Sequence, residues 1–228
     1  MEKRYSRNLE SLSSQDMEVL HGKKVCVVGC GGLGGHIIET LARIGVLHLT
    51  VVDCDVFDES NLNRQLFCTE DSIGLPKTES VKRRIAQVNS SVQVNAVSAR
   101  LEEGNALEIV AGHDLVMDAL DSISARLVLV AACKQAGIPL VHGAIAGWHG
   151  QVATVFPGDE TLNMLYANAS DGGSLTKLGN LPFTALAVAA IQSAEAVKIL
   201  IGKEAVLKNR ILLIDLLNDA FDTVFTEQ

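Results

Sequence analysis

Zinc-binding and membrane-spanning features are absent from this sequence. Its five cysteines form no C-x-x-C pair, and none of them follows Cys133. We therefore predict no zinc site and expect reduced thiols in a cytoplasmic protein. No run of about 18 uncharged apolar residues occurs, and residues 1–7 contain no apolar leader region, so neither membrane insertion nor export is expected.

Basic residues are fewer than acidic residues in this sequence. Against 27 acidic side chains stand 19 of Lys and Arg, which gives a formal net charge of -8. A surface that binds nucleic-acid phosphates needs clustered positive charge, so a nucleic-acid partner is not expected. A hydrophobic content of 48% over 228 residues is ample for a sizeable core in one domain.

Apolar, β-branched runs alternate with helical stretches between residues 25 and 143. The expected strands are 25–28, 47–52, 92–97, 115–117 and 140–141, and the expected helices are 34–44, 76–88 and 123–136. Alternation of this kind predicts an α/β fold with a Rossmann-like parallel sheet and helices on both faces.

The pattern changes after Gly150. Residues 151–156 alternate like a half-buried strand, and residues 158–180 are rich in Gly, Ser and Asn, which predicts a long structureless loop. A buried helix follows from Pro182 to near Gly202, and short strands at 210–214 and 223–225 extend the sheet, most simply in antiparallel fashion. We predict one domain over residues 1–228, with a nucleotide-binding half (1–145) and a second half (146–228) that completes the sheet.

A glycine loop follows the first strand and opens the first helix of this unit. Gly29, Gly31 and Gly34 have the G-x-G-x-x-G spacing that lets backbone approach a phosphate at a helix N-terminus. Asp53 ends the second strand, where an acid binds ribose hydroxyls. Taken alone, these residues fit an NAD-binding dehydrogenase.

Polar residues directly after Asp53 have no evident use in hydride transfer. Asn61-Leu62-Asn63-Arg64-Gln65 brings amides and a cation close in sequence to the loop, and Lys77 adds a second cation. Asp121 follows the strand that ends near Asp118, so it belongs at the carboxyl edge of the sheet, where it could hold Mg²⁺. Fixed cations and a metal-binding acid suit chemistry at phosphorus.

The combination resembles the ThiF/MoeB/HesA family, the prokaryotic relatives of ubiquitin-activating enzymes. The matching motifs are Arg4-Tyr5-Ser6-Arg7-Asn8 (R-Y-x-R-x), residues 29–34 (G-x-G-G-L-G), Asp53-Cys54-Asp55 (D-x-D), residues 61–65 (N-L-x-R-Q), residues 74–77 (G-x-x-K), residues 113–121 (H-D-L-V-x-D-x-x-D) and Gly150-Gln151. They are distributed over essentially the whole chain.

The resemblance implies adenylation of a small ubiquitin-like sulfur carrier that ends in Gly-Gly. The carrier's terminal carboxylate would attack the α-phosphate of ATP, with Mg²⁺ as cofactor, and pyrophosphate would leave. Catalytic roles then fall to Arg64, Lys77, Asp121 and, across a homodimer interface, Arg7. The implied nucleotide-binding residues are Gly29, Gly31, Gly32, Gly34, Asp53, Asp55, Ser60, Asn61, Asn63, Arg64, Gln65, Lys77, Asp121 and Ser122.

The sequence departs from the family at three places. The two zinc-binding C-x-x-C pairs of many members are missing, and so is the cysteine that some members use to link the carrier covalently. The family's D-N is Asp121-Ser122 here. We therefore expect an enzyme that stops at the acyl-adenylate and passes it to a separate sulfur donor or nucleophile.

Three other functions stay open on the sequence. The Asp118 to Ser122 string also resembles that of tRNA threonylcarbamoyladenosine dehydratases, although the acidic balance argues against a tRNA substrate. The glycine loop alone also fits an NAD(P)-dependent oxidoreductase or a non-catalytic nucleotide-binding module. Each residue also has a structural alternative: Lys77 as an ordinary helix lysine, Arg64 as a loop ion-pair partner, Asp121 as a helix N-cap and His142 as a satisfied strand-end histidine.

Overall fold

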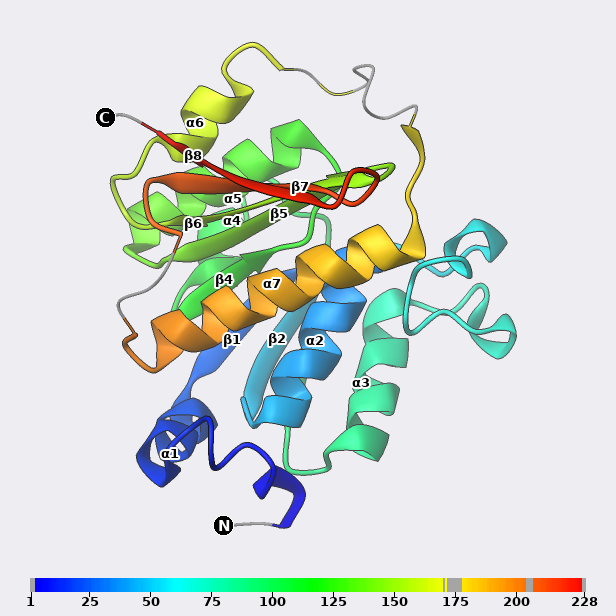
Figure 1. The fold of residues 1–228 in the computed structure, drawn as a ribbon. Coiled ribbons are helices and arrows are strands. Elements are labelled where there is room, and N and C mark those ends of the chain that lie inside the picture. Colours follow the sequence, from blue (N-terminus) through cyan, green and yellow to red (C-terminus); the bar gives the residue numbers. More distant parts are fainter. Residues whose placement is uncertain (1–2, 170, 172–177, 204–206, 227–228) are drawn as a thin grey trace.

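One eight-stranded sheet runs through the protein, in the order β3-β2-β1-β4-β5-β6-β7-β8 (Figure 1). The computed structural model describes residues 3–169, 171, 178–203 and 207–226. The strands are β1 (Lys24–Val28), β2 (His48–Val52), β3 (Gln93–Val97), β4 (Leu115–Asp118), β5 (Leu140–Ala146), β6 (His149–Val155), β7 (Arg210–Asp215) and β8 (Ala220–Phe225). Strands β1 to β5 pair in parallel, and β5 to β8 pair antiparallel.

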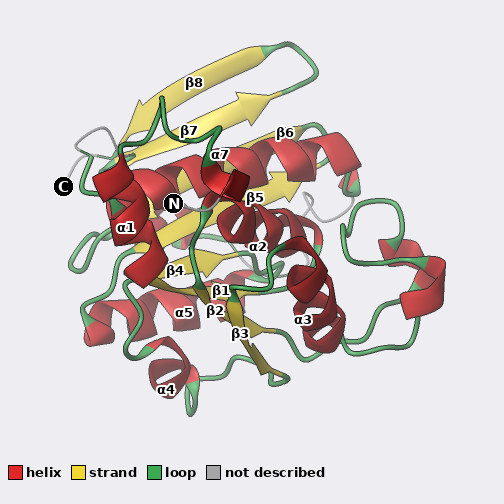
Figure 2. Ribbon diagram, turned by 90° about the horizontal axis from the view of Figure 1, so that it is seen from below, coloured by secondary structure: helices red, strands yellow, loops and turns green. Residues whose placement is uncertain are grey.

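Helices cover both faces of this sheet (Figure 2). They are α1 (Ser14–Gly22), α2 (Gly32–Ile44), α3 (Lys77–Val88), α4 (Ala106–Val110), α5 (Ile123–Ala136), α6 (Thr161–Tyr166) and α7 (Pro182–Leu200). Side chains of α1, α2, α3 and α7 form one hydrophobic core with the sheet, and those of α4, α5 and α6 form a second. The predicted fold class, a Rossmann-like parallel sheet extended by antiparallel strands, is confirmed.

Local sequence signals explain where most elements begin and end. The parallel strands β1, β2 and β4 are almost entirely buried, as their apolar runs predict. Gly45 and Gly137 end α2 and α5 in the left-handed region, with φ of 110° and 71°. Ser13 and Asp16 form a capping box at the start of α1, a helix that was not predicted.

The long structureless loop predicted after residue 158 is wrong in part, because α6 lies within it. Asp159 accepts a hydrogen bond from the Thr161 N–H (2.7 Å) and so satisfies the first turn of that helix. Leu162 and Tyr166, one helical turn apart, enter the second core. Helix α4 was missed as well, and β5 runs five residues beyond Val141. Residues 170 and 172–177 of the predicted loop lie outside the described residues.

Helix α7 is long and apolar enough to cross a membrane by length and composition alone. It lies against the sheet and α2, in front of the strands in Figure 1. Gln192, Ser193 and Glu195 are buried on it, and Glu195 accepts hydrogen bonds from Thr154 of β6 and from the Leu207 N–H. The expected buried core helix is thus confirmed.

Candidate adenylation site

The glycine loop lies where the strand order of the sheet reverses. β1 has β2 on one side and β4 on the other, and the chain crosses in opposite directions from this point. Gly29 donates to the Val52 carbonyl (2.8 Å) at the end of β2, and the Ala119 N–H donates to the Val28 carbonyl (2.9 Å). The carboxyl ends of three strands therefore meet at the loop, the position where open α/β sheets bind ligands.

Two of the loop glycines are required by packing. A Cβ at Gly34 would lie 1.8 Å from the Gly29 carbonyl oxygen. Gly29 has φ of 101°, and a Cβ there would lie 2.4 Å from the Ala119 carbonyl oxygen. At Gly32, by contrast, the nearest atom is Cγ of Arg64 at 3.5 Å, an ordinary contact. A methyl group therefore fits sterically at Gly32, as it does at Gly31, so packing alone does not explain the glycine at this position.

Asp53 holds the glycine loop in place. One of its carboxylate oxygens accepts from the Cys30 N–H (2.7 Å) and the other from the Asp55 N–H (2.8 Å). The predicted ribose-binding acid therefore also has a structural role in the protein itself. Each oxygen retains acceptor capacity for a hydroxyl group.

Lys77, the first residue of α3, is buried beside two carboxylates. Its Nζ lies 3.0 Å from Asp55 Oδ2 and 3.9 Å from Asp53 Oδ2. Burial opposes ionisation of Asp55, but the hydrogen bond and charge of Lys77 outweigh it and lower the pKa of that carboxyl. Lys77 is therefore not an ordinary exposed helix lysine, and it joins the segment after β2 to the start of α3.

Arg64 lies over the other side of the loop, next to Gly32. Its Nη1 donates to the Ser60 carbonyl (3.0 Å) and to Asn63 Oδ1 (2.8 Å). Within the described residues Arg64 makes no ion pair with a carboxylate, so the alternative role as a loop ion-pair partner is not what the structure shows. Its positive charge is available to an anion.

The neighbours of Arg64 are held by local bonds. Asn61 accepts from the Asp58 N–H (3.1 Å) in a short 3-10 turn (Glu59–Asn61), and Asn63 donates to the Asn180 carbonyl (3.0 Å) just before α7. Gln65 is buried, its Oε1 has no hydrogen-bond partner, and its Nε2 would lie 3.6 Å from a Cβ added at Gly31. The polar string thus reaches from the glycine loop to the start of α7.

Asp121 stands on the loop that connects β4 to α5. Its side chain is exposed and has no hydrogen bond or ion pair within the described part of the chain. The N-cap of α5 is Ser122, whose hydroxyl accepts from the Ala125 N–H (3.4 Å), so the alternative of Asp121 as N-cap is excluded. An unpaired carboxylate at the carboxyl edge is a donor of the kind that Mg²⁺ takes.

A buried polar network lies beneath this loop. Asp118 is fully buried, accepts from the Leu120 N–H (3.0 Å) and lies 2.6 Å from Nδ1 of His142. Burial lowers the pKa of His142, against the pull of Asp118, so the ring is neutral near pH 7. Its Nδ1 then donates to Asp118, and its Nε2 accepts from the Tyr166 hydroxyl (3.1 Å). His142 is thus a satisfied histidine, as predicted.

Arg7 lies at the other end of the sheet. It sits between Tyr5, which receives a hydrogen bond from Asn89 beyond the end of α3, and α1, which leads into the first residue of β1. The structure therefore does not bring Arg7 to the glycine loop of its own chain. The other predicted site residues do gather at the carboxyl edge.

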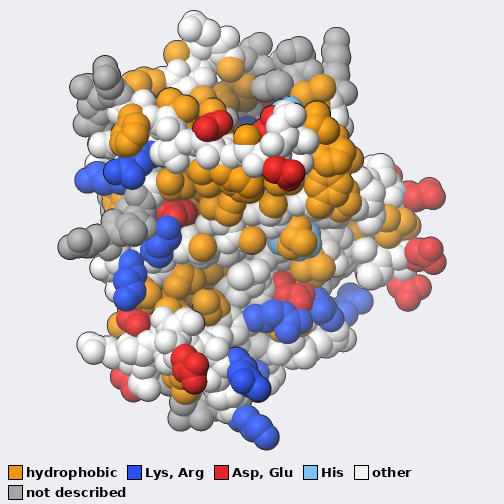
Figure 3. Space-filling view, in the orientation of Figure 1, with side chains coloured by type: hydrophobic (Ala, Val, Ile, Leu, Met, Phe, Trp, Pro, Cys, Tyr) orange, Lys and Arg blue, Asp and Glu red, His pale blue; other side chains and the backbone are white. Residues whose placement is uncertain are grey.

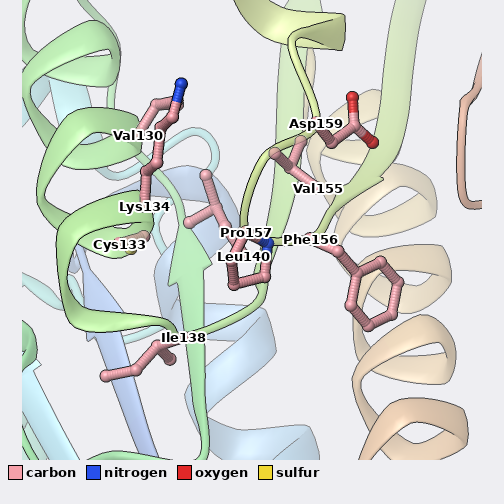
Figure 4. A pocket seen from close by; sticks show the side chains of 9 residues that line it. All are labelled: Val130, Cys133, Lys134, Ile138, Leu140, Val155, Phe156, Pro157 and Asp159. Atoms are coloured by element: carbon pink, nitrogen blue, oxygen red, sulfur yellow. The ribbon is translucent and has the colours of Figure 1, made fainter.

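The small pocket in Figure 4 is not this site. It lies between the end of α5 and the end of β6, with Cys133, Lys134 and Asp159 among its lining residues. Leu140, the first residue of β5, lines it too, which places it at the opposite edge of the sheet from the glycine loop. Burial raises the pKa of the Cys133 thiol to about 12, so this cysteine is no nucleophile.

Two carboxylates and a thiol after β2 form another possible metal-binding group. Asp53, Cys54 and Asp55 place one ligand atom each within 4.8 Å of one another. The Lys77 ammonium group already lies between these two carboxylates, so a cation that bound both would have to displace it. This group is therefore already engaged within the protein itself. The expected absence of zinc stays a prediction.

Sequence reasoning did not single out Arg126 and Tyr166. Arg126 is buried on α5, 3.6 Å from Asp118, and Tyr166 belongs to the unpredicted α6. One signal was available, namely an arginine within the apolar helix pattern 123–136, since a buried guanidinium requires a partner.

Comparison with known proteins identifies the family. The ThiF family profile matches residues 5–228. The chain is 39% identical to "SAMP-activating enzyme E1" of Haloferax volcanii, with 97% of this chain and 84% of that protein aligned. It is 39% identical to "Molybdopterin-synthase adenylyltransferase" of Salmonella typhimurium over 67% of this chain and 62% of that one.

Two further comparisons concern longer proteins. The chain is 34% identical to "Adenylyltransferase and sulfurtransferase MOCS3" of Aedes aegypti over 93% of its own length, but spans only 50% of that protein. The structure of E. coli MccB with succinimide aligns with a TM-score of 0.85 and 20% identity, over 99% of this chain and 72% of MccB, and so agrees in fold. The match along nearly the whole chain confirms the resemblance seen in the motifs, and the protein belongs to the ThiF family.

Proposed function

We propose that this protein is an ATP-dependent adenylyltransferase that activates the C-terminal glycine carboxylate of a small ubiquitin-like sulfur carrier. The observation that carries the proposal is the arrangement at the carboxyl edge of the sheet. A glycine loop opens α2, and the side chain of Arg64 lies against Gly32. Among the described residues neither the Arg64 guanidinium nor the Asp121 carboxylate has an ion-pair partner. The names of the relatives bear out this prediction at the level of the activity.

The chemistry needs these charges because two anions must meet. The carrier carboxylate attacks the α-phosphorus of ATP, a mixed anhydride with AMP forms, and pyrophosphate leaves. Arg64 and Lys77 would hold phosphate oxygens and stabilise the charge that builds up on them. Mg²⁺, when bound at Asp121, would neutralise further phosphate charge. Asp53 would hold the ribose while it keeps the loop in shape.

The alternatives are less well supported. The relatives named as adenylyltransferases favour carrier activation over tRNA threonylcarbamoyladenosine dehydration and hydride transfer. One MccB structure is described as a complex with ATP, which supports ATP as a ligand of this fold. The molybdopterin branch is represented among the relatives, but we leave the pathway of this chain open.

An apolar surface on the antiparallel half is available for the carrier. Trp148, before β6, packs against Phe183 at the start of α7, with ring centroids 4.7 Å apart and the rings tilted by 46°. Other exposed hydrophobic side chains of this region are Leu186, Leu213, Leu217, Phe221, Val224 and Phe225. Figure 3 shows hydrophobic side chains gathered over α7 and the neighbouring strands. Exposed apolar groups of this extent suit a protein partner.

We further propose that the enzyme works as a homodimer in the cytoplasm. Arg7 is exposed and remote from the glycine loop of its own chain, so a role in adenylation requires the loop of a second copy. Because no cysteine follows Cys133, the adenylate would pass to a separate sulfur donor. In this proposed route the carrier forms no covalent intermediate with residues 158–181.

The test is transfer of AMP to a carrier. The protein is incubated with ATP, Mg²⁺ and a ThiS-like or MoaD-like carrier, and intact-mass spectrometry detects the carrier adenylate. A carrier that lacks its last glycine and the Arg64→Ala variant are expected to give no adenylate. Arg83→Ala, an exposed arginine on α3, is the matched control and is expected to react normally. Binding of NAD(P)H without any ATP binding would favour an oxidoreductase instead.

A further inference from the structure

Arg126 is the point at which three parts of the protein meet under the Asp121 loop. Its Nη2 donates to the Leu120 carbonyl (2.5 Å), and its Nε lies 3.6 Å from Asp118 Oδ2. Its Nη1 donates to the Tyr166 hydroxyl of α6 (3.4 Å). The guanidinium therefore contacts the residue directly before Asp121, the end of β4 and the first helix beyond β6.

The loop has few other attachments. Asp118 accepts from the Leu120 N–H, so Asp118 and Arg126 hold both backbone groups of Leu120. Asp121 itself makes no bond within the described residues. Its position is therefore set by Leu120 on one side and by the start of α5 on the other. There Ser122 caps the helix, and Asp171 accepts from the Ile123 N–H (2.5 Å).

The network also fixes the charge of its members. Asp118 and Arg126 are both buried, with relative exposures of 0% and 8%, and form an ion pair. The neutral His142 ring links Asp118 to Tyr166, and Gln151 of β6 donates to the Tyr166 hydroxyl (2.8 Å). Among the described residues Arg126 Nε has no hydrogen bond, but the guanidinium charge is paired with Asp118. Another geometry of the buried pair would leave a charge unpaired.

We propose that Arg126 is a positioning residue of the adenylation site, which fixes the Asp121 loop for Mg²⁺ and makes its position depend on Tyr166 of α6. The carrier-binding half would thereby set the geometry of the metal-binding acid, with no contact between Arg126 and substrate. This inference rests on the proposed function. Outer partners of a metal ligand typically contribute about 10-fold to 100-fold in metal affinity, which sets the expected effect.

The experiment measures binding of α,β-methylene ATP by calorimetry, with Mg²⁺ and with EDTA. In the wild type Mg²⁺ is expected to tighten binding. Arg126→Lys keeps the charge, but its shorter side chain does not reach Leu120. The gain in nucleotide affinity that Mg²⁺ gives should therefore fall by about 10-fold, while the affinity measured in EDTA should stay within about twofold of the wild-type value. Higher Mg²⁺ should restore the gain, because the ligand is displaced and not removed.

Three further variants make the result decisive. Asp121→Asn should abolish the Mg²⁺-dependent gain in affinity, and higher Mg²⁺ should not restore it. Tyr166→Phe should show the same effect as Arg126→Lys in a weaker form. Lys134→Met removes the exposed pair between Lys134 of α5 and Glu160 before α6 (2.5 Å), a second α5 to α6 contact that does not touch the loop. It should leave the gain unchanged.

The outcomes separate the two proposals. A full Mg²⁺-dependent gain in Arg126→Lys and Tyr166→Phe, with loss in Asp121→Asn, overturns the positioning role and leaves the adenylation site standing. Equal losses of affinity with Mg²⁺ and with EDTA also overturn it, since a merely structural role predicts them. An unchanged gain in Asp121→Asn overturns both this inference and the metal assignment of the proposed function.

Discussion

Alanine substitution at two neighbouring glycines separates folding of the loop from binding of the nucleotide. In Gly34→Ala the new Cβ would lie 1.8 Å from the Gly29 carbonyl oxygen and 2.7 Å from its carbon. Both are backbone atoms and have no rotamer by which to move away. In Gly32→Ala the nearest atoms, Arg64 Cγ and Ala185 Cβ, lie at 3.5 and 3.6 Å, so the methyl group fits.

The magnitudes follow from these contacts. Overpacking a tight site costs about 1–3 kcal/mol, and a clash with backbone falls at the upper end, about 3 kcal/mol. For a chain of this length each kcal/mol shifts the Tm by about 2–4 °C, so Gly34→Ala should lose roughly 6–12 °C. Gly32→Ala should keep the wild-type stability or gain up to about 1 kcal/mol, because alanine favours the helix that Gly32 begins.

Thermal unfolding and ATP binding are measured on both variants. Gly32→Ala is expected to be stable yet to bind ATP at least about tenfold more weakly, since its methyl group occupies the space between Arg64 and α7 over which the phosphates would lie. Wild-type ATP affinity in Gly32→Ala would place the nucleotide elsewhere. A wild-type Tm for Gly34→Ala would refute the packing argument.

Three other substitutions and one labelling experiment test charge and exposure at the loop and on α2. Arg64→Ala should abolish adenylation with little change in Tm, whereas Lys77→Ala should also lose about 3 kcal/mol of stability by urea unfolding, because Asp53 stays buried without its cation. Cys54 is the exposed one of the five cysteines, so maleimide should label one thiol in the folded protein and all five in denaturant, and labelling in the presence of ATP should be slower. Glu39 is buried, which by itself raises the pKa of its carboxyl, but Arg84 and Arg43 lower that pKa below the ordinary 4.5. The stabilisation by these pairs is therefore complete above pH 4.5 and is lost as the pH falls through the lower folded value. Glu39→Gln should flatten the loss of Tm in that range. Wild-type activity in Arg64→Ala, labelling of several thiols in the folded state, or an unchanged pH profile would each contradict its prediction.

The parts of the site that the sequence predicted depend on local signals. The strand, glycine loop and helix from Val25 to Ile44 follow one another directly, and Gly45 marks the end of the helix. Asp53 and Asp121 were placed at the carboxyl edge because each comes directly after a buried strand. The burial of Lys77 between two carboxylates was not predicted, since the Asp55 carboxylate lies 22 positions away in sequence.

The parts that escaped prediction depend on distant contacts or short elements. The Asp118, His142 and Tyr166 network joins β4, β5 and α6, and no local pattern records that pairing. Helix α6 has six residues, too few for a helical period to stand out in a stretch read as loop. The role of Arg7 depends on a second copy of the chain and stays a prediction.

The central claim is adenylation of a carrier carboxylate, and exchange of pyrophosphate into ATP tests it most directly. Labelled pyrophosphate enters ATP only if the adenylate forms reversibly on the enzyme. The account predicts exchange that requires both Mg²⁺ and a carrier ending in Gly-Gly, and that disappears in Arg64→Ala but not in Arg83→Ala. Exchange of equal rate without a carrier, or no exchange with any Gly-Gly carrier despite tight ATP binding, would contradict it.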